Sequence, residues 1–226
     1  VDSKIDLRIL RKGKDEPFDV TLNRAVIKIS PVRARVEGNV AYVRLTTFNE
    51  QTASEMRDKV AELKGKIGDK ITGLVLDLRN NPGGLLDQAV AVADAYIDKG
   101  EIVSTRGRRP DSIQRFNARP GDIVDNLPMV VLINGGTGFN EQNRVPEAVG
   151  VLFERTVQGF GEMFRQLSFA EIKGSAMQSR ALAGLANRTL ICCLPGSTGA
   201  CQLGWEQLIR DQLDARTRPC NFVSHL

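Results

Sequence analysis

The sequence predicts an α/β protein with a β-rich beginning and a parallel-sheet βαβ core. Three observations support this prediction: apolar and polar residues alternate near the start, an apolar strand at 74–78 precedes a helical pattern, and a second apolar strand at 130–133 runs into a glycine-rich loop. Alternation is typical of half-buried strands, and continuous apolar strands separated by helices are typical of parallel sheets.

The β-rich beginning is expected to contain two hairpins. KIDLRILRKGKDEPFDVTLNRAVI alternates on both sides of a turn at 12–15, and a second strand pair is expected at 31–36 and 40–45. A helix then follows, with Asn49 as its N-cap and Gly68 at its end. Helical spacing predicts that its buried face consists of Ala53, Met56, Val60 and Leu63.

The middle of the chain predicts a right-handed βαβ unit, in which the strand at 74–78 is followed by a turn, a helix at 85–97 and a strand at 102–105. Residues 106–128 are polar without a clear period and predict a surface excursion. In the last part, helices are expected at 146–153, 179–184 and 200–213, and a buried strand at 188–194.

Composition limits the classes of function. The net charge of +4 is mild, and the arginines between 106 and 119 form only a loose run, which favours a solvated loop over a nucleic-acid surface. Neither a membrane-length apolar run nor a signal peptide is found, so a cytoplasmic location without membrane contact is expected. The four cysteines lack metal-ligand spacing, and buried free thiols are expected.

Histidine-dependent chemistry is excluded, because the one histidine, His225, lies next to the C-terminus. A Ser-His-Asp triad, a Cys-His pair and a histidine metal site would each need that residue to reach the sheet. A serine hydrolase would therefore need a lysine base, and Lys173 is the one lysine downstream of Ser104. No metal site is expected.

Two glycine-rich loops carry the remaining candidate chemistry. Gly83 and Gly84, between a strand and a helix, are expected either to hold an oxyanion through their N–H groups or to form only a tight turn. In the loop Gly135-Gly136-Thr137-Gly138, the absence of side chains lets a phosphate approach the backbone, and the threonine hydroxyl adds a donor.

Residues 4 to 134 resemble the C-terminal processing proteases, which are serine peptidases with a Ser-Lys dyad. FDVTLNRAVIKI is similar to the end of their PDZ domain, LDLRNNPGG to their signature segment, and MVVLINGG to the strand before the nucleophile. The resemblance stops at Gly136. Phe139 stands where the resemblance places the nucleophilic serine, and the segment that carries the lysine base has no counterpart, so no peptidase activity is expected.

Residues 135 to 226 resemble MoaB, of the MoaB/MogA family in molybdenum cofactor biosynthesis, on GGTGFNEQNRVPEAV, GFGEMFRQLSFAEI, QSRALAGLANRTLI and LPGSTGAC. This resemblance implies a molybdopterin site and self-association through the MoaB-like half. Asn143 replaces the usual aspartate and the family's first half is absent, so magnesium and ATP are not expected. The implied partial cofactor site consists of Gly136, Thr137, Gly138, Glu141, Pro146, Glu147, Ser179, Arg180, Pro195, Gly196 and Ser197.

Because both families have a strand and two glycines at the join, we infer a chimera. Its expected parts are a PDZ remnant at 1–30, a protease-core-like βαβ segment at 31–134 and a MoaB-like molybdopterin-binding half-domain at 135–226. Neither half keeps a whole catalytic apparatus. The chain is therefore predicted to be inactive, with no catalytic residue, a pterin-phosphate ligand, and Gly83 and Gly84 as an oxyanion-site remnant.

Three alternatives stay open. The first is a carboxyl-terminal processing endopeptidase remnant, without its serine and lysine, that recruits Thr137 as nucleophile and Lys173 as base. The second is a structural chimera that binds no ligand, and the third is a sequence that folds poorly. In its own family the protease-like part would be periplasmic.

Overall fold

The computed structural model describes residues 2–13, 16–25, 30–105 and 113–226, which fall into two compact units divided between residues 30 and 31. The smaller unit is a hairpin of two antiparallel strands, β1 (Lys4–Ile9) and β2 (Phe18–Asn23). The hairpin predicted from alternation is therefore confirmed. Its expected turn includes Lys14 and Asp15, which lie outside the described residues.

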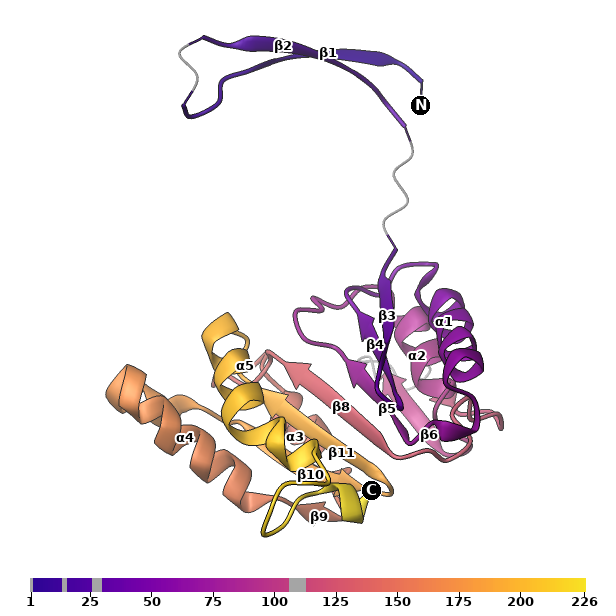
Figure 1. Ribbon diagram of the computed structural model, residues 1–226, viewed down its shortest axis with the longest axis vertical. Helices are drawn as coiled ribbons and strands as arrows, with labels where there is room; N and C mark the ends of the chain where they lie inside the picture. Colours follow the sequence, from indigo (N-terminus) through magenta and orange to yellow (C-terminus); the bar gives the residue numbers. More distant parts are fainter. Residues whose placement is uncertain (1, 14–15, 26–29, 106–112) are drawn as a thin grey trace. The chain divides into compact units, whose positions relative to one another are not determined.

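The larger unit is built on a seven-stranded sheet with the order β3-β4-β5-β8-β11-β10-β9 (Figure 1). The strands from β4 to β11 in this order are parallel, and the pairs toward both edges are antiparallel. The predicted α/β class with a parallel core is thus confirmed. The strands are β3 Val32–Glu37, β4 Val40–Leu45, β5 Gly73–Asp77, β8 Met129–Asn134, β9 Arg155–Thr156, β10 Leu182–Ala186 and β11 Thr189–Leu194.

Helices cover opposite faces in the two halves of this sheet (Figure 1). One face of β3, β4 and β5 packs against α1 (Thr52–Ile67) and α2 (Leu86–Asp94). The other face, at β10 and β11, packs against α4 (Gln158–Ile172) and α5 (Thr198–Gly204). A short helix, α3 (Val145–Gly150), follows the glycine loop. The predicted buried face of α1 is confirmed, because all four of its apolar side chains are buried.

Strand β8 is the central strand and connects the two halves of the chain. It pairs with β5 on one side and with β11 on the other. Met129 and Val131 pack in the core under α1 and α2, whereas Val130 and Leu132 pack in the core under α4 and α5. A strand that is apolar on both faces is typical of the middle of a parallel sheet, so the run VVLI serves both cores.

The strand predicted at 102–105 is present, but the prediction that it joins the parallel sheet is wrong. Strand β6 (Glu101–Thr105) lies outside the main sheet and pairs antiparallel with β7 (Gln114–Asn117). Part of the expected surface excursion is therefore a strand, and its residues 106–112 lie outside the described residues. Two parallel crossovers are β4–α1–β5 and β5–α2–β8, because the next strand that joins β5 is β8, and a third, longer one leads from β8 to β11.

The predicted helix at 179–184 is also wrong, because Leu182–Ala186 forms β10. Leucine and alanine favour helices, but hydrogen bonding to β11 outweighs that preference. Helix α4 is absent from the sequence prediction, since Gly159 and Gly161 in its first turn are poor helix formers. Asn49 is not the N-cap of α1: the N-cap is Gln51, whose N–H donates to Asn49 Oδ1 at 3.0 Å.

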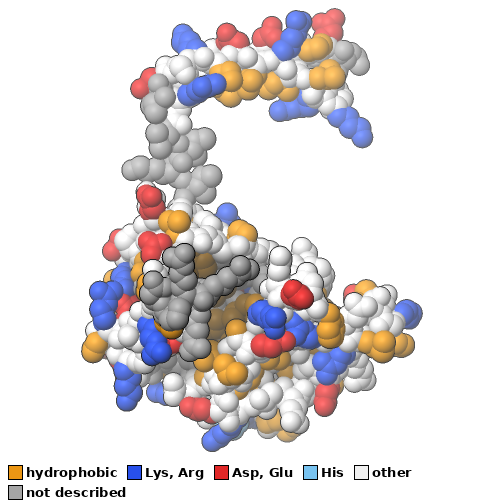
Figure 2. Space-filling model, turned by 180° about the vertical axis from the view of Figure 1, so that it is seen from behind, with side chains coloured by type: hydrophobic (Ala, Val, Ile, Leu, Met, Phe, Trp, Pro, Cys, Tyr) orange, Lys and Arg blue, Asp and Glu red, His pale blue; other side chains and the backbone are white. Residues whose placement is uncertain are grey.

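Three of the four cysteines are buried free thiols, as expected, whereas Cys220 is exposed. Burial raises the pKa of the Cys192 thiol and raises that of Cys193 to about 12, so both thiols are protonated at neutral pH. On the face drawn in Figure 2, basic and acidic side chains are interspersed. None of the described helices is both long and apolar enough to cross a membrane.

Candidate functional site

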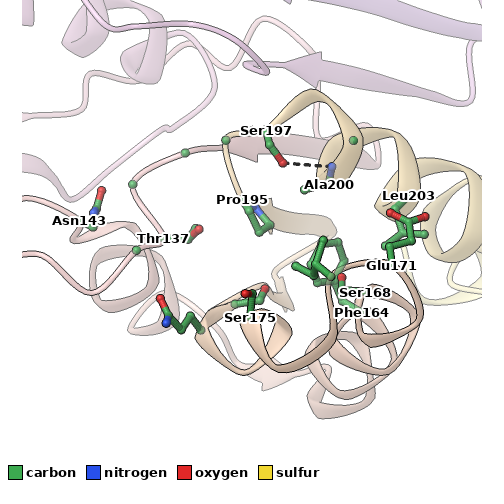
Figure 3. Close-up of a pocket in the computed structure, with 18 residues that line it drawn as sticks. Thr137, Asn143, Phe164, Ser168, Glu171, Ser175, Pro195, Ser197, Ala200 and Leu203 are labelled. Atoms are coloured by element: carbon green, nitrogen blue, oxygen red, sulfur yellow. Dashed lines mark hydrogen bonds between the residues drawn. The ribbon is translucent and has the colours of Figure 1, made fainter.

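A cavity of about 500 Å³ opens where β8 and β11 end (Figure 3). Its walls are the glycine loop after β8, the loop at 195–197 after β11, α5, and α4 with the short 3-10 helix that follows it. Ligands of open α/β sheets bind at the carboxyl ends of parallel strands, which is where this cavity lies. The implied site residues that line it are Gly136, Thr137, Gly138, Ser179, Pro195, Gly196 and Ser197.

The glycine loop leaves backbone donors unused on a segment that lines the cavity. Gly135 and Gly136 have φ angles of 84° and 62°, which glycine adopts without strain. A Cβ at Gly136 would lie 2.5 Å from Val145 Cγ2. In the described part of the chain, the N–H groups of Gly136, Thr137 and Gly138 donate to no protein acceptor. Adjacent free N–H groups of this kind attract anions.

Arg180 fixes the conformation of this loop. Its Nε donates to the Thr137 carbonyl at 3.1 Å, and its Nη2 donates to the carbonyls of Gly138 and Asn143 at 2.5 and 2.6 Å. Its Nη1 pairs with Glu147, whose pKa is lowered by its own backbone N–H and by Arg180. Because the guanidinium donates hydrogen bonds to carbonyl oxygens of the loop, it holds the loop in place while the N–H groups of Gly136, Thr137 and Gly138 stay free.

The rest of the cavity wall combines hydroxyl groups with an apolar side. The hydroxyls belong to Thr137, Ser168, Ser175, Ser179 and Ser197, and the apolar side to Phe164, Ile172 and Leu203. Ser197 caps α5, since its Oγ accepts from the Ala200 N–H at 3.3 Å (Figure 3). Of the residues described, no lysine or arginine lines the cavity, and Glu171 is its one acidic residue. An anionic group here would be held by neutral donors rather than by a counter-charge.

Several lining residues escaped the sequence prediction. Phe164, Ser168 and Glu171 come from α4, and Ser175 and Gln178 from the turn after it. The available signal was the helical spacing of Phe160, Phe164 and Ser168, which places these side chains on one side of a helix.

Other predicted residues lie outside the cavity lining. Neither Glu141 nor Arg180 lines it. Arg180 instead holds the glycine loop by donating to the Thr137 carbonyl. Gly83 and Gly84 do not line it either, and the Gly83 N–H already donates to Asn81 Oδ1 at 2.8 Å. Lys173 is also absent from the lining, and its Nζ donates to the Ala170 carbonyl at 3.1 Å. The structure therefore does not bring Lys173 and Thr137 to one cavity wall.

The fold and the cavity define an α/β protein with a glycine-loop cavity at the carboxyl edge of its sheet. Residues 39–138 match Peptidase family S41. The carboxy-terminal-processing protease of Bartonella bacilliformis is 51% identical over 134 residues, which is 59% of this chain and 31% of that protein. Molybdenum cofactor biosynthesis protein B of Escherichia coli is 63% identical over 104 residues, which is 46% of this chain and 61% of that protein.

Solved structures of both kinds are also similar. A photosystem II D1 C-terminal processing protease is 28% identical with a TM-score of 0.41, and covers 64% of this chain and 40% of its own. A molybdenum cofactor biosynthesis protein B is 27% identical with a TM-score of 0.42, and covers 77% of this chain and 88% of its own.

The chain thus carries a protease-like part and a MoaB-like part, and the matches support a chimera, as the two resemblances predicted. It spans less than two thirds of the length of each of the two curated relatives, at 31% and 61%.

Proposed function

We propose that the cavity binds a phosphate-bearing pterin of the molybdopterin class and that the chain does not turn it over. The observation that carries this proposal is the set of three unused N–H groups at Gly136, Thr137 and Gly138 on the cavity wall. A phosphate group would accept from these donors and from nearby hydroxyls. The apolar wall at Phe164, Ile172 and Leu203 suits the face of a ring.

The name of the MoaB-like relative agrees with this ligand class. The MoaB-like match is to a molybdenum cofactor biosynthesis protein. The segments on which the sequence resembles that family, GGTGFNEQNRVPEAV and LPGSTGAC, include both loops that form the cavity. Asn143 lines the cavity with an amide in place of a carboxylate, so a magnesium-dependent step is not part of the proposal.

Peptide hydrolysis is likewise not part of the proposal. Phe139, at the position that the protease resemblance assigns to the nucleophile, has no hydroxyl and leaves 70% of its surface exposed. Thr137 remains as the hydroxyl of the glycine loop, but Lys173 does not share its cavity. A nucleophile without an adjacent base is weak.

Calorimetric titration with a phosphorylated pterin tests the proposed ligand. Thr137→Val keeps the side-chain shape and removes one donor, so it is expected to weaken binding about tenfold. Gly138→Val should abolish binding, because even a Cβ there would lie 2.8 Å from Asn143 Nδ2 and the rest of the side chain would crowd the cavity wall. The matched controls are Thr156→Val and Gly159→Ala, at exposed residues outside the lining. Equal heats for the parent and both cavity variants would refute the proposal.

A further inference from the structure

A second cavity, of about 240 Å³, is lined by residues from both parts of the chain. The protease-like part contributes Arg44 at the end of β4 together with Arg79 and Asn80 after β5. The MoaB-like part contributes Thr198, Cys201 and Gln202 of α5 and Trp205 just after it. A site built in this way exists only where the two segments meet.

The lining of this second cavity carries excess positive charge. Of the residues described, it contains two arginines and no acidic residue. Arg79 is neutralised by Asp77, which it contacts at 2.7 and 2.9 Å and whose side chain is fully buried. Burial raises the pKa of Asp77, but hydrogen bonds from Arg79 and Tyr42 outweigh burial and lower it, so this carboxylate is ionised. Asp77 thus neutralises Arg79, and the charge of the second guanidinium, that of Arg44, has no carboxylate in contact with it.

Arg44 has no acidic partner of its own. Its Nη2 donates to the Arg79 carbonyl at 3.1 Å. Its Nε is buried without a hydrogen-bond partner, the one buried side-chain nitrogen or oxygen in that state within the described part of the chain. A buried, charged donor that is left unpaired is costly, and native proteins rarely keep one. Gln202, which is exposed, donates to Glu206, so that carboxylate lies nearby but outside the lining.

We propose that this second cavity binds a small anion that carries a phosphate or carboxylate group. Arg44 supplies the donors that lack a partner, whereas Nε and Nη2 of Arg79 already donate to Asp77. Trp205 closes one wall, with the Arg79 guanidinium 5.7 Å from the centre of its ring. The site is distinct from the glycine-loop cavity, since the two share no lining residue, although α5 contributes residues to both.

The chain has one tryptophan, Trp205, so its fluorescence reports on this cavity. Inorganic phosphate and acetate are titrated separately at constant ionic strength. A saturable change is expected with at least one of them, and the anion that produces it identifies the group recognised. Arg44→Gln should raise the dissociation constant about tenfold or more. Arg35→Gln, an exposed arginine outside the cavity lining, should leave it unchanged.

A second variant keeps the proposal testable if Arg44→Gln does not fold. Gln202→Glu changes an exposed side chain and adds a carboxylate to the lining, so it should weaken anion binding at neutral pH. Thr137→Val in the pterin cavity should leave the fluorescence titration unchanged. The proposal is overturned if neither anion gives a saturable change, if Arg44→Gln and Gln202→Glu both bind like the parent, or if Thr137→Val abolishes the signal.

Discussion

Replacing Phe164 with alanine is expected to lower the free energy of unfolding by about 3–5 kcal/mol. Phe164 lies on α4, is 1% exposed, and packs in the same core as Val130 and Leu132 of the central strand. Removing its ring leaves a cavity that a rigid parallel sheet cannot fill by collapse. Urea denaturation measures the change, and the dependence of the free energy on urea should stay the same.

Phe169 provides the matched control for this prediction. It lies on the same helix but is 56% exposed, so Phe169→Ala should change the unfolding free energy by only about 0.5 kcal/mol. Equal effects of the two substitutions would show that α4 does not pack its Phe164 side on β8, β10 and β11.

The second large effect is expected at Gly84, where Gly84→Ala should lower the free energy of unfolding by about 3 kcal/mol or more. Gly84 has a φ of 148°, and a Cβ there would lie 2.1 Å from the Phe48 carbonyl oxygen. That atom belongs to the backbone and accepts from the Leu85 N–H at 2.8 Å, so it cannot move without breaking this hydrogen bond. Thermal and urea denaturation both report the loss.

Gly65 is the control glycine for this substitution. It is exposed within α1, and a Cβ there would meet nothing within 4 Å. Gly65→Ala should therefore stabilise the protein by about 0.5–1 kcal/mol through helix propensity. If Gly84→Ala proved as stable as Gly65→Ala, the claim that the Gly84 backbone packs closely against the Phe48 carbonyl would be contradicted.

Local patterns were sufficient to predict much of the fold. The hairpin alternation and the buried face of α1 depend on periodicity, and β8 depends on a continuous apolar run; a single segment carries each of these signals by itself. The pairing of β6 with β7 and the strand at Leu182–Ala186 depend on partners distant in the sequence. No local pattern distinguishes such pairing, which is why the segment at 179–184 was predicted to be helical.

The candidate site was predictable only on its loop side. We could predict Thr137, Ser197 and the glycines of their two loops, because parallel strands place the loops that follow them at one edge of the sheet. The α4 wall, with Phe164 and Ser168, could not be placed without α4 itself. The second cavity was also beyond prediction, because Arg44 and Trp205 approach only once β4 and α5 are arranged by the common sheet.

The division of the chain at 134/135 stays a prediction. In the structure this position lies at the end of β8, the strand that joins the two predicted parts. Strand β8 pairs with β5 of the protease-like part and with β11 of the MoaB-like part. The expected fusion therefore does not separate two folding units. Its two segments share one sheet, with a core on each face of the central strand.

Differential scanning calorimetry of the parent chain, Met56→Ala and Phe164→Ala tests this shared sheet most directly. Met56 is fully buried in the core under α1, and Phe164 is buried in the core under α4. We expect one transition for residues 31–226, with equal calorimetric and van't Hoff enthalpies, and both variants should lower its midpoint. Two transitions, one moved only by Met56→Ala and the other only by Phe164→Ala, would show that the two segments fold apart.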